Sequence, residues 1–231
     1  MLIGGLQKLA MVDYPGRLAA TVFTAGCNLR CPFCHNALLV TRLEETPPLD
    51  AQEVLDFLRS RRGLLDGVVL SGGEPLLHPD AAGFLKKVRE LGFAVKLDTN
   101  GCFPDRLAAV LEAGLADYVA MDIKNSPDKY PVTVGIPDFD TAPVSESVRL
   151  LAESGVDHEF RTTLVRELHT RDSLLAIGRW LPPDSRYFLQ KFVDSGDLVG
   201  QGCHGFDGGE MREILEIVRP LLPRAELRGV D

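Results

Sequence analysis

Short apolar runs alternate with amphipathic stretches along most of the chain. Apolar residues recurring every three or four positions indicate helices, and short apolar runs between turn residues indicate buried strands. We therefore expect strands at residues 18–24, 67–70, 94–98, 117–123, 159–165 and 187–193. We expect helices at residues 51–60, 81–91, 104–114, 145–155, 171–181 and 209–221, the first of them capped by Asp50.

Each predicted strand is followed by a predicted helix, which favours an α/β fold with a parallel sheet and right-handed crossovers. The apolar runs suggest strands that are buried on both faces. Six strand–helix units are too few for a closed eight-stranded barrel, so we expect an open or partial (β/α)6 barrel. A doubly wound open sheet would produce the same pattern. Both folds place their chemistry at the carboxyl ends of the strands.

Composition limits the partners and the compartment. Hydrophobic residues make up 45% and charged residues 25%, which is ordinary for a globular protein. The net charge of −8 disfavours nucleic acid as a partner, because phosphate binding needs clustered Lys and Arg. We expect no membrane partner, since no apolar run reaches about 18 residues. The chain does not open with a basic segment followed by an apolar one, as a secretion signal would. We therefore expect the protein in the reducing cytoplasm.

Three of the five cysteines lie close together, as Cys27, Cys31 and Cys34. A structural zinc site usually takes four ligands, and His35 adjoins Cys34 too closely to share one ion easily. Three thiolates instead suit a cubane iron–sulfur cluster that leaves one iron open, although ordinary ferredoxin spacings differ. A structural zinc site remains the alternative at this point. Cys102 and Cys203 stand far from this triplet.

Polar motifs follow the next predicted strands. They are Ser-Gly-Gly-Glu-Pro at 71–75, Asp-Thr-Asn-Gly at 98–101 and Asp-Ile-Lys at 122–124. Paired glycines allow close approach of the backbone to a ligand, and two carboxylates at adjacent strand ends could bind one cation. In the fifth predicted strand, alternation puts Arg161 and Thr163 on one face, where a buried guanidinium would need a carboxylate.

These features resemble the radical S-adenosylmethionine (SAM) superfamily, whose signature is C-x3-C-x-aromatic-C, with Phe33 at the aromatic position. Residues 12–17 (Val-Asp-Tyr-Pro-Gly-Arg), with 23–27 and 34–36, resemble the opening of glycyl-radical-enzyme activating proteins. That family includes the activators of pyruvate formate-lyase and of anaerobic ribonucleotide reductase. The resemblance implies one radical SAM domain over residues 1–231. It also implies SAM and one [4Fe–4S] cluster, held by Cys27, Cys31 and Cys34.

The resemblance also implies which residues surround SAM. The Gly-Gly-Glu-Pro element would bind its amino group and Lys124 its carboxylate, and a monovalent cation could sit beside Asp98 and Asp122. Gln190 and Lys191 stand where the formate-lyase activator carries a His-containing motif, which leaves the ribose contacts unassigned. The complete implied set is Phe33, Gly72, Gly73, Glu74, Pro75, Asp98, Thr99, Asp122, Lys124 and Arg161.

The implied activity is reductive cleavage of SAM, followed by abstraction of a hydrogen atom from a glycine of a large partner enzyme. Anaerobic ribonucleotide reductase is the partner that the opening favours, with a flavodoxin or ferredoxin-type reductant. We expect Asp13 to act with the cysteines, near the mouth where the glycine loop enters. One alternative is a radical SAM enzyme acting on a small molecule such as a deazapurine precursor. Others are a zinc or thiol-switch module and a ferredoxin-like carrier, which the missing fourth thiol disfavours.

Overall fold

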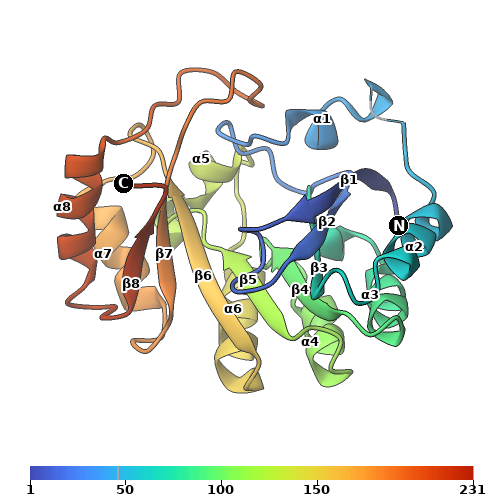
Figure 1. Cartoon of the computed structure of the whole chain (residues 1–231). Helices are drawn as coiled ribbons and strands as arrows, with labels where there is room; N and C mark the ends of the chain where they lie inside the picture. The colour runs from blue at the N-terminus through green and yellow to red at the C-terminus, as the bar shows by residue number, and fades with distance from the viewer. Residues whose placement is uncertain (46, 231) are drawn as a thin grey trace.

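The computed structural model describes residues 1–45 and 47–230 and is built around one sheet of eight strands (Figure 1). β1 pairs antiparallel with β2, and each later neighbouring pair is parallel. The strands are β1 Ile3–Ala10, β2 Ala19–Thr24, β3 Gly67–Gly72, β4 Ala94–Thr99, β5 Tyr118–Asp122, β6 Asp157–Leu164, β7 Tyr187–Lys191 and β8 Ala225–Arg228.

Helices connect the parallel strands. Among the described residues, none of these helices is both long enough and apolar enough to cross a membrane. The α-helices are α1 Ala37–Val40, α2 Ala51–Ser60, α3 Ala81–Glu90, α4 Pro104–Glu112, α5 Tyr130–Val134, α6 Ala142–Ser154, α7 Arg171–Trp180 and α8 Gly208–Val218. Short 3-10 turns lie at Leu43–Glu45, Pro75–Leu77 and Pro127–Lys129.

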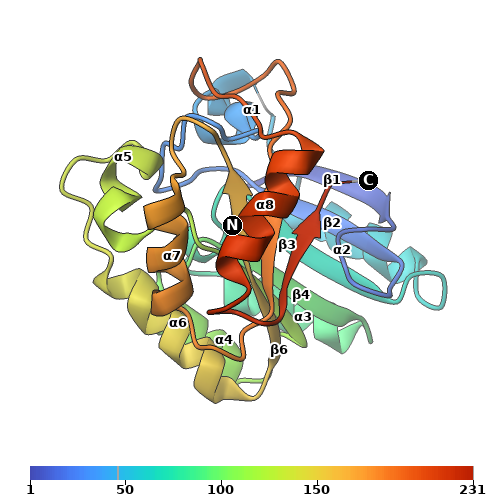
Figure 2. The same ribbon diagram turned by 90° about the vertical axis from the view of Figure 1, so that its left-hand side faces the viewer.

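The strand order distinguishes between the two expected folds. A doubly wound sheet reverses its strand order at a switch point, whereas this sheet follows the chain from β1 to β8. Right-handed crossovers taken in one direction put every connecting helix on the same face. Figures 1 and 2 show the longer helices, which are α2, α3, α4, α6, α7 and α8, on the outer side of the curved sheet, and the short α1 above the upper ends of the strands. No pairing joins β1 to β8 within residues 1–45 and 47–230, so the fold is a partial barrel.

The six predicted strand–helix units are all present, as β2 to β7 and the helices that follow them. The Asp50 carboxylate caps α2 by accepting from the backbone N–H groups of Gln52 and Glu53, as predicted. The edge strands β1 and β8 were not predicted. β1 contains two glycines and buries mainly its two end residues, and β8 has four residues, so neither carries a clear apolar pattern.

The expected burial of the strands on both faces is confirmed for most positions of β2 to β5, but only the outer face is mainly apolar. Outward-facing residues such as Val68 and Leu97 are fully buried against the helices. The inner face has a small apolar floor that includes Tyr14 and Tyr118. Beyond that floor the inner face carries charged side chains, because register places Asp98, Asp122, Glu159 and Arg161 on the same face of their strands. The barrel interior is therefore a polar chamber that opens toward the carboxyl ends.

Candidate active site at the carboxyl ends of the strands

The cysteine loop follows β2 directly and forms one wall of a cavity of about 210 Å³ at the carboxyl ends of the strands. The five cysteines of the chain are unpaired thiols. Cys31 and Phe33 are buried, and Cys27 and Cys34 are partly exposed. The predicted residues that line this cavity with the three cysteines are Phe33, Gly72, Gly73, Glu74, Pro75, Asp98, Thr99, Asp122, Lys124 and Arg161.

The cysteine loop is held by hydrogen bonds to its own carbonyl groups. The Arg30 guanidinium donates to the carbonyls of Cys27 and Leu29 at 2.7 and 2.8 Å. The backbone N–H of Arg30 donates to the Val134 carbonyl at 2.8 Å, which ties the loop to α5. The Leu29 N–H points at the Cys27 sulfur, at 3.4 Å. The loop is therefore fixed on both sides of the thiols.

A late segment of the chain covers the cysteine loop, which the sequence did not reveal. The Gly200 N–H donates to the Pro32 carbonyl at 2.8 Å, and the Val199 N–H donates to the Cys34 carbonyl at 3.3 Å. His35 Nδ1 lies 3.1 Å from the Ser195 hydroxyl. In Figure 1 the loop after β7 lies beside α1 at the top of the molecule. The loop between β7 and α8 therefore packs against the cysteine loop, and we call it the roof.

The donor set fits an iron–sulfur cluster. Within the described residues, no three His, Cys, Asp or Glu side chains are arranged to hold a single metal ion. A cubane makes a different demand, because each cysteine binds a different iron. Burial raises the pKa of Cys27 to about 11 and that of Cys31 to about 12. Metal binding to these groups therefore releases protons.

The Gly-Gly turn packs against the backbone that leads into the cysteines. Gly72 has a φ of +115°, and a Cβ there would lie 2.3 Å from the Thr24 nitrogen. A Cβ on Gly73 would lie 2.1 Å from the Gly26 carbonyl oxygen. The Asn36 side-chain amide donates to the Gly72 carbonyl at 2.8 Å. In this structure, the lack of Cβ atoms on the two glycines therefore lets the turn pack closely against the backbone of residues 24–26.

Glu74 is fully buried, and its carboxylate accepts three hydrogen bonds from the protein. The donors are the Leu76 N–H at 2.9 Å, the Thr99 hydroxyl at 2.8 Å and the Asn100 N–H at 2.7 Å. Burial raises its pKa to about 7, against the opposing effect of these hydrogen bonds. Glu74 and Thr99 therefore bind each other and join the strand ends of β3 and β4. Pro75 follows as the first residue of a 3-10 turn.

Alternating charges cross the inner face between β4 and β6. Arg161 Nε donates to Asp122 at 2.8 Å, and Arg161 Nη1 lies 3.4 Å from Asp98. Lys124 Nζ donates to the other Asp122 oxygen at 2.9 Å. Burial alone would raise the pKa of Asp122, but the Arg161 and Lys124 charges outweigh it and lower that pKa. The same balance lowers the pKa of Asp98, where Arg161 and Lys96 supply the opposing charge.

Sequence reasoning missed Lys96, whose ammonium donates to Asp98 at 2.6 Å. Alternation along β4 puts Lys96 and Asp98 on the same face, so the signal was present in the sequence. It also missed Asn100, whose amide nitrogen lies 3.8 Å from the Cys27 sulfur. An amide donor beside a ligating sulfur tunes the metal that the sulfur holds.

The backbone around Lys124 has its own buried support. Its N–H donates to the Tyr130 hydroxyl at 3.1 Å. The Val165 N–H donates to His169 Nδ1 at 3.0 Å, which leaves the ring proton on Nε2. His169 Nε2 therefore donates to the Lys124 carbonyl at 2.9 Å. Burial lowers the pKa of His169, which keeps the ring neutral. No sequence signal separated His169 from an ordinary loop histidine.

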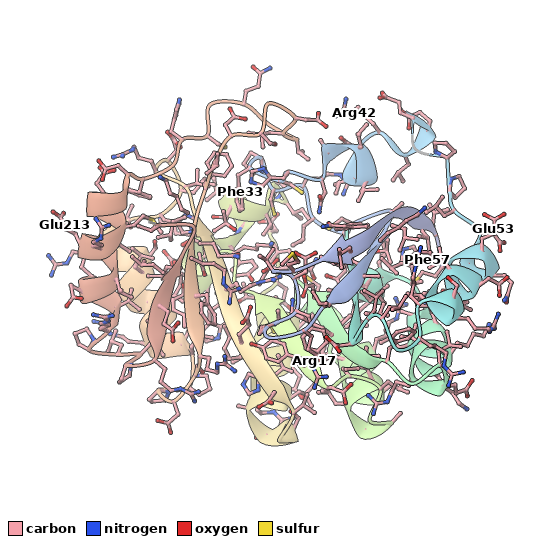
Figure 3. All side chains as sticks on the ribbon, viewed as in Figure 1. Arg17, Phe33, Arg42, Glu53, Phe57 and Glu213 are labelled. Carbon is pink, nitrogen blue, oxygen red and sulfur yellow. The ribbon has the colours of Figure 1, made fainter. Side chains whose placement is uncertain are left out.

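The segment 12–17 does not lie where the sequence reasoning put it. β1 runs antiparallel to β2, so the loop between them turns at the amino ends of the parallel strands, opposite the cysteines. Figure 3 shows Phe33 in the upper half of the molecule and Arg17 in the lower half. The Asp13 carboxylate accepts from the Thr21 hydroxyl at 2.6 Å. The expected place of Asp13 at the mouth is wrong, whereas its part in the reaction stays a prediction.

Comparison with known proteins agrees with this geometry. The Radical SAM superfamily model matches residues 21–174. A Methanocaldococcus jannaschii protein provisionally named a glycyl-radical enzyme activating enzyme is 30% identical over 239 residues, covering 100% of this chain and 97% of that protein. The 7-carboxy-7-deazaguanine synthase of Methanopyrus kandleri is 36% identical over 130 residues, covering 48% of this chain and 51% of that enzyme.

A solved domain of a pyruvate-formate lyase-activating enzyme from Bacteroides vulgatus has a TM-score of 0.57 and 19% identity, covering 71% of this chain and 99% of that domain. At that identity the likeness concerns the fold. The superfamily match spans both the cysteine loop and the charged strand ends, and the archaeal similarity runs the whole length. The chain therefore belongs to the radical SAM superfamily, as a member of its glycyl-radical-enzyme activating family.

Proposed function

We propose that this protein cleaves SAM reductively and removes a hydrogen atom from a glycine Cα of a partner glycyl-radical enzyme. The observation that carries the proposal is the single cavity that joins three free thiols to the charged strand ends of an open barrel. The full-length similarity to an activating enzyme favours a glycyl-radical enzyme as the partner.

The thiols and the strand ends have separate tasks in this proposal. Cys27, Cys31 and Cys34 would hold the [4Fe–4S] cluster. When bound, the cluster and SAM together supply one electron, the cleavage of a carbon–sulfur bond and a carbon radical that accepts a hydrogen atom. The protein contributes binding, orientation and exclusion of water, because such a radical reacts with whatever it meets.

The charge of the chamber suits the methionine end of SAM. In the set of ion pairs around Asp98 and Asp122, the cations Arg161, Lys124 and Lys96 outnumber the two carboxylates by one positive charge. The Glu74 carboxyl also lines the cavity, but its hydrogen bonds come from neutral donors. That excess can meet one carboxylate of a ligand through charge-assisted hydrogen bonds. Carbonyl groups of the Gly-Gly turn would accept from the ammonium group of SAM. These residues thereby fix the orientation of the sulfonium relative to the thiols.

Within residues 1–45 and 47–230, β1 and β8 do not pair, and the open side that this leaves suits a polypeptide substrate. A closed barrel would admit small molecules through its mouth, whereas an open side also admits a loop of another protein. We propose anaerobic ribonucleotide reductase as the partner, on the resemblance of residues 12–17, 23–27 and 34–36. A flavodoxin or ferredoxin-type protein would supply the electron, in the cytoplasm, where the five free thiols stay reduced. A monovalent cation beside Asp98 and Asp122 remains a sequence prediction.

Electron paramagnetic resonance on the partner tests the proposal. The cluster-loaded protein, a reductant, SAM and a candidate ribonucleotide reductase should produce a glycyl radical and 5′-deoxyadenosine. Cys31→Ala should abolish both signals and the cluster, whereas Cys203→Ala should keep all three. Cluster-loaded protein that produces 5′-deoxyadenosine but no radical on any glycyl-radical enzyme would contradict the proposed partner class.

A second candidate function is chemistry on a small molecule, such as a deazapurine precursor. It is favoured by the 36% identity to a 7-carboxy-7-deazaguanine synthase, which extends over about half of each chain. Turnover of a free deazapurine precursor with SAM, monitored by mass spectrometry, would support this candidate. Absence of turnover, together with a radical on the partner enzyme, would exclude it.

A further inference from the structure

Lys96 is a buried cation that adds a positive charge to the chamber, but the proposal above assigns it no contact with SAM. It lies in the middle of β4 on the inner face of the barrel, and its side chain is 3% exposed. Its ammonium donates to Asp98 Oδ1 at 2.6 Å, the one partner recorded for it in the described part of the chain. A buried ammonium without a close carboxylate is costly, so this pair is held together strongly.

All four carboxylate oxygens of Asp98 and Asp122 already accept from the protein. Asp98 Oδ2 accepts from the Ser71 hydroxyl at 3.1 Å and faces Arg161 at 3.4 Å. The two oxygens of Asp122 accept from Arg161 and Lys124. An alkali metal ion at these oxygens would have to displace these donors, and it would stand beside three fixed positive charges. Coulomb repulsion in a partly buried site opposes that arrangement.

We propose that the Lys96 ammonium is the built-in counter-ion of Asp98, so that this protein binds SAM without an alkali metal ion. Lys96 acts as a positioning residue: it holds Asp98 in place, and Asp98 and Asp122 in turn orient Arg161 toward the cavity. This inference rests on the SAM-binding part of the proposed function and is independent of which partner enzyme is activated.

The first test uses the unmodified, cluster-loaded protein. SAM binding is measured by equilibrium dialysis in potassium, sodium or choline chloride at equal ionic strength, because choline is too large for such a site. We expect the same dissociation constant in all three salts. An affinity about tenfold weaker in choline than in potassium would mean that a required alkali ion binds at the site, and would overturn the inference.

Two variants test the role of the ammonium directly. Lys96→Ala should weaken SAM binding in choline by about tenfold or more, the worth of a charge-assisted hydrogen bond. Potassium or ammonium ions should restore much of that affinity by entering the space left by the side chain. Lys96→Met fills that space, so its loss should not be restored. Lys86→Ala, on the exposed side of α3, is the matched control and should bind SAM normally.

The outcomes separate the two proposals. Normal SAM affinity of Lys96→Ala in choline, or a loss that no small cation restores, would overturn the counter-ion role. Iron content and circular dichroism verify that each variant is folded, and the salt test on the unmodified protein decides the question even if a variant fails to fold. Failure of the unmodified protein to bind SAM in any salt would overturn the proposed function and this inference with it.

Discussion

At the scale of single residues, Glu74 shows how a motif residue can act through the shape of a site. Its carboxylate faces the protein and accepts from the backbone of Leu76 and Asn100 and from the Thr99 hydroxyl. This arrangement fixes the end of β3 relative to the end of β4. Glu74 is thus well placed to hold the Gly-Gly turn and Asp98 at a constant separation.

The buried Glu74 carboxyl predicts a pH dependence of stability. Burial raises its pKa from 4.5 to about 7 in the folded protein. Because the folded pKa is raised, the stabilisation is complete below the unfolded pKa and is lost as the pH rises through the folded pKa. Between about pH 6 and pH 8, the free energy of unfolding of the cluster-loaded protein should fall by about 1 kcal/mol relative to Glu74→Gln.

Urea denaturation of both proteins across this pH range measures that difference. Glu112→Gln is the control, because Glu112 is exposed at the end of α4 and its replacement should leave the pH profile unchanged. Parallel pH profiles for the unmodified protein and Glu74→Gln would show that Glu74 does not titrate in this range.

At the scale of elements, the roof formed by the loop between β7 and α8 has the clearest consequence. Gly200 packs so closely that a Cβ on it would lie 2.6 Å from the Pro32 Cβ. Gly200→Ala should therefore shift the roof away from the cysteine loop, at a cost of about 1–3 kcal/mol. The exposed cluster should bleach faster in air, as followed by its visible absorbance.

Gly83→Ala gives the matched control for this experiment. Gly83 lies inside α3, where a Cβ meets nothing within 4 Å. An alanine there should leave the bleaching rate unchanged and stabilise the helix slightly, since Ala favours helix over Gly. Equal bleaching rates for the two variants would mean that the roof does not protect the cluster.

The strands and helices that bury more apolar side chains were easier to predict from the sequence. The β2 to β7 strands carry apolar runs because their outer faces pack under helices, and the helices carry matching apolar stripes. β1 and β8 lie at the open edges of the sheet, with one neighbouring strand each. An edge strand buries less, so its sequence is under less constraint and periodicity cannot identify it.

At the scale of the whole molecule, topology explains which site residues could be predicted. Parallel strands bring their carboxyl ends to one edge, so residues after successive strands converge even when they are far apart in sequence. Asp98, Asp122 and Arg161 meet for this reason. Asp13 lies just before β2, so the same rule places it at the amino ends of the strands, opposite the cysteines that follow β2. The roof could not be predicted, because two of its contacts are backbone hydrogen bonds without residue preference and its side-chain contact joins His35 to Ser195, 160 positions later.

An open barrel must also secure its last strand, and the inner face supplies the means. Arg228 on β8 donates to both Glu159 oxygens, at 2.8 and 3.0 Å, and its guanidinium lies 3.8 Å from the Phe188 ring centre. The Tyr118 hydroxyl donates to the same carboxylate at 2.6 Å. This cluster around the buried Glu159 carboxylate joins β5, β6, β7 and β8 below the charged layer of the site.

Arg228→Met should destabilise the protein, because it leaves the buried Glu159 carboxylate without its cation. We expect a loss of about 1–3 kcal/mol in urea denaturation, since the guanidinium itself is partly exposed. The double variant Glu159→Gln with Arg228→Met should recover part of that loss, because no buried charge then remains unpaired. Arg224→Met, which removes a hydrogen bond from an exposed side chain to the Asp184 carbonyl, is the control. Equal stability of the Arg228 and Arg224 variants would show that the Arg228–Glu159 pair does not help to hold β8.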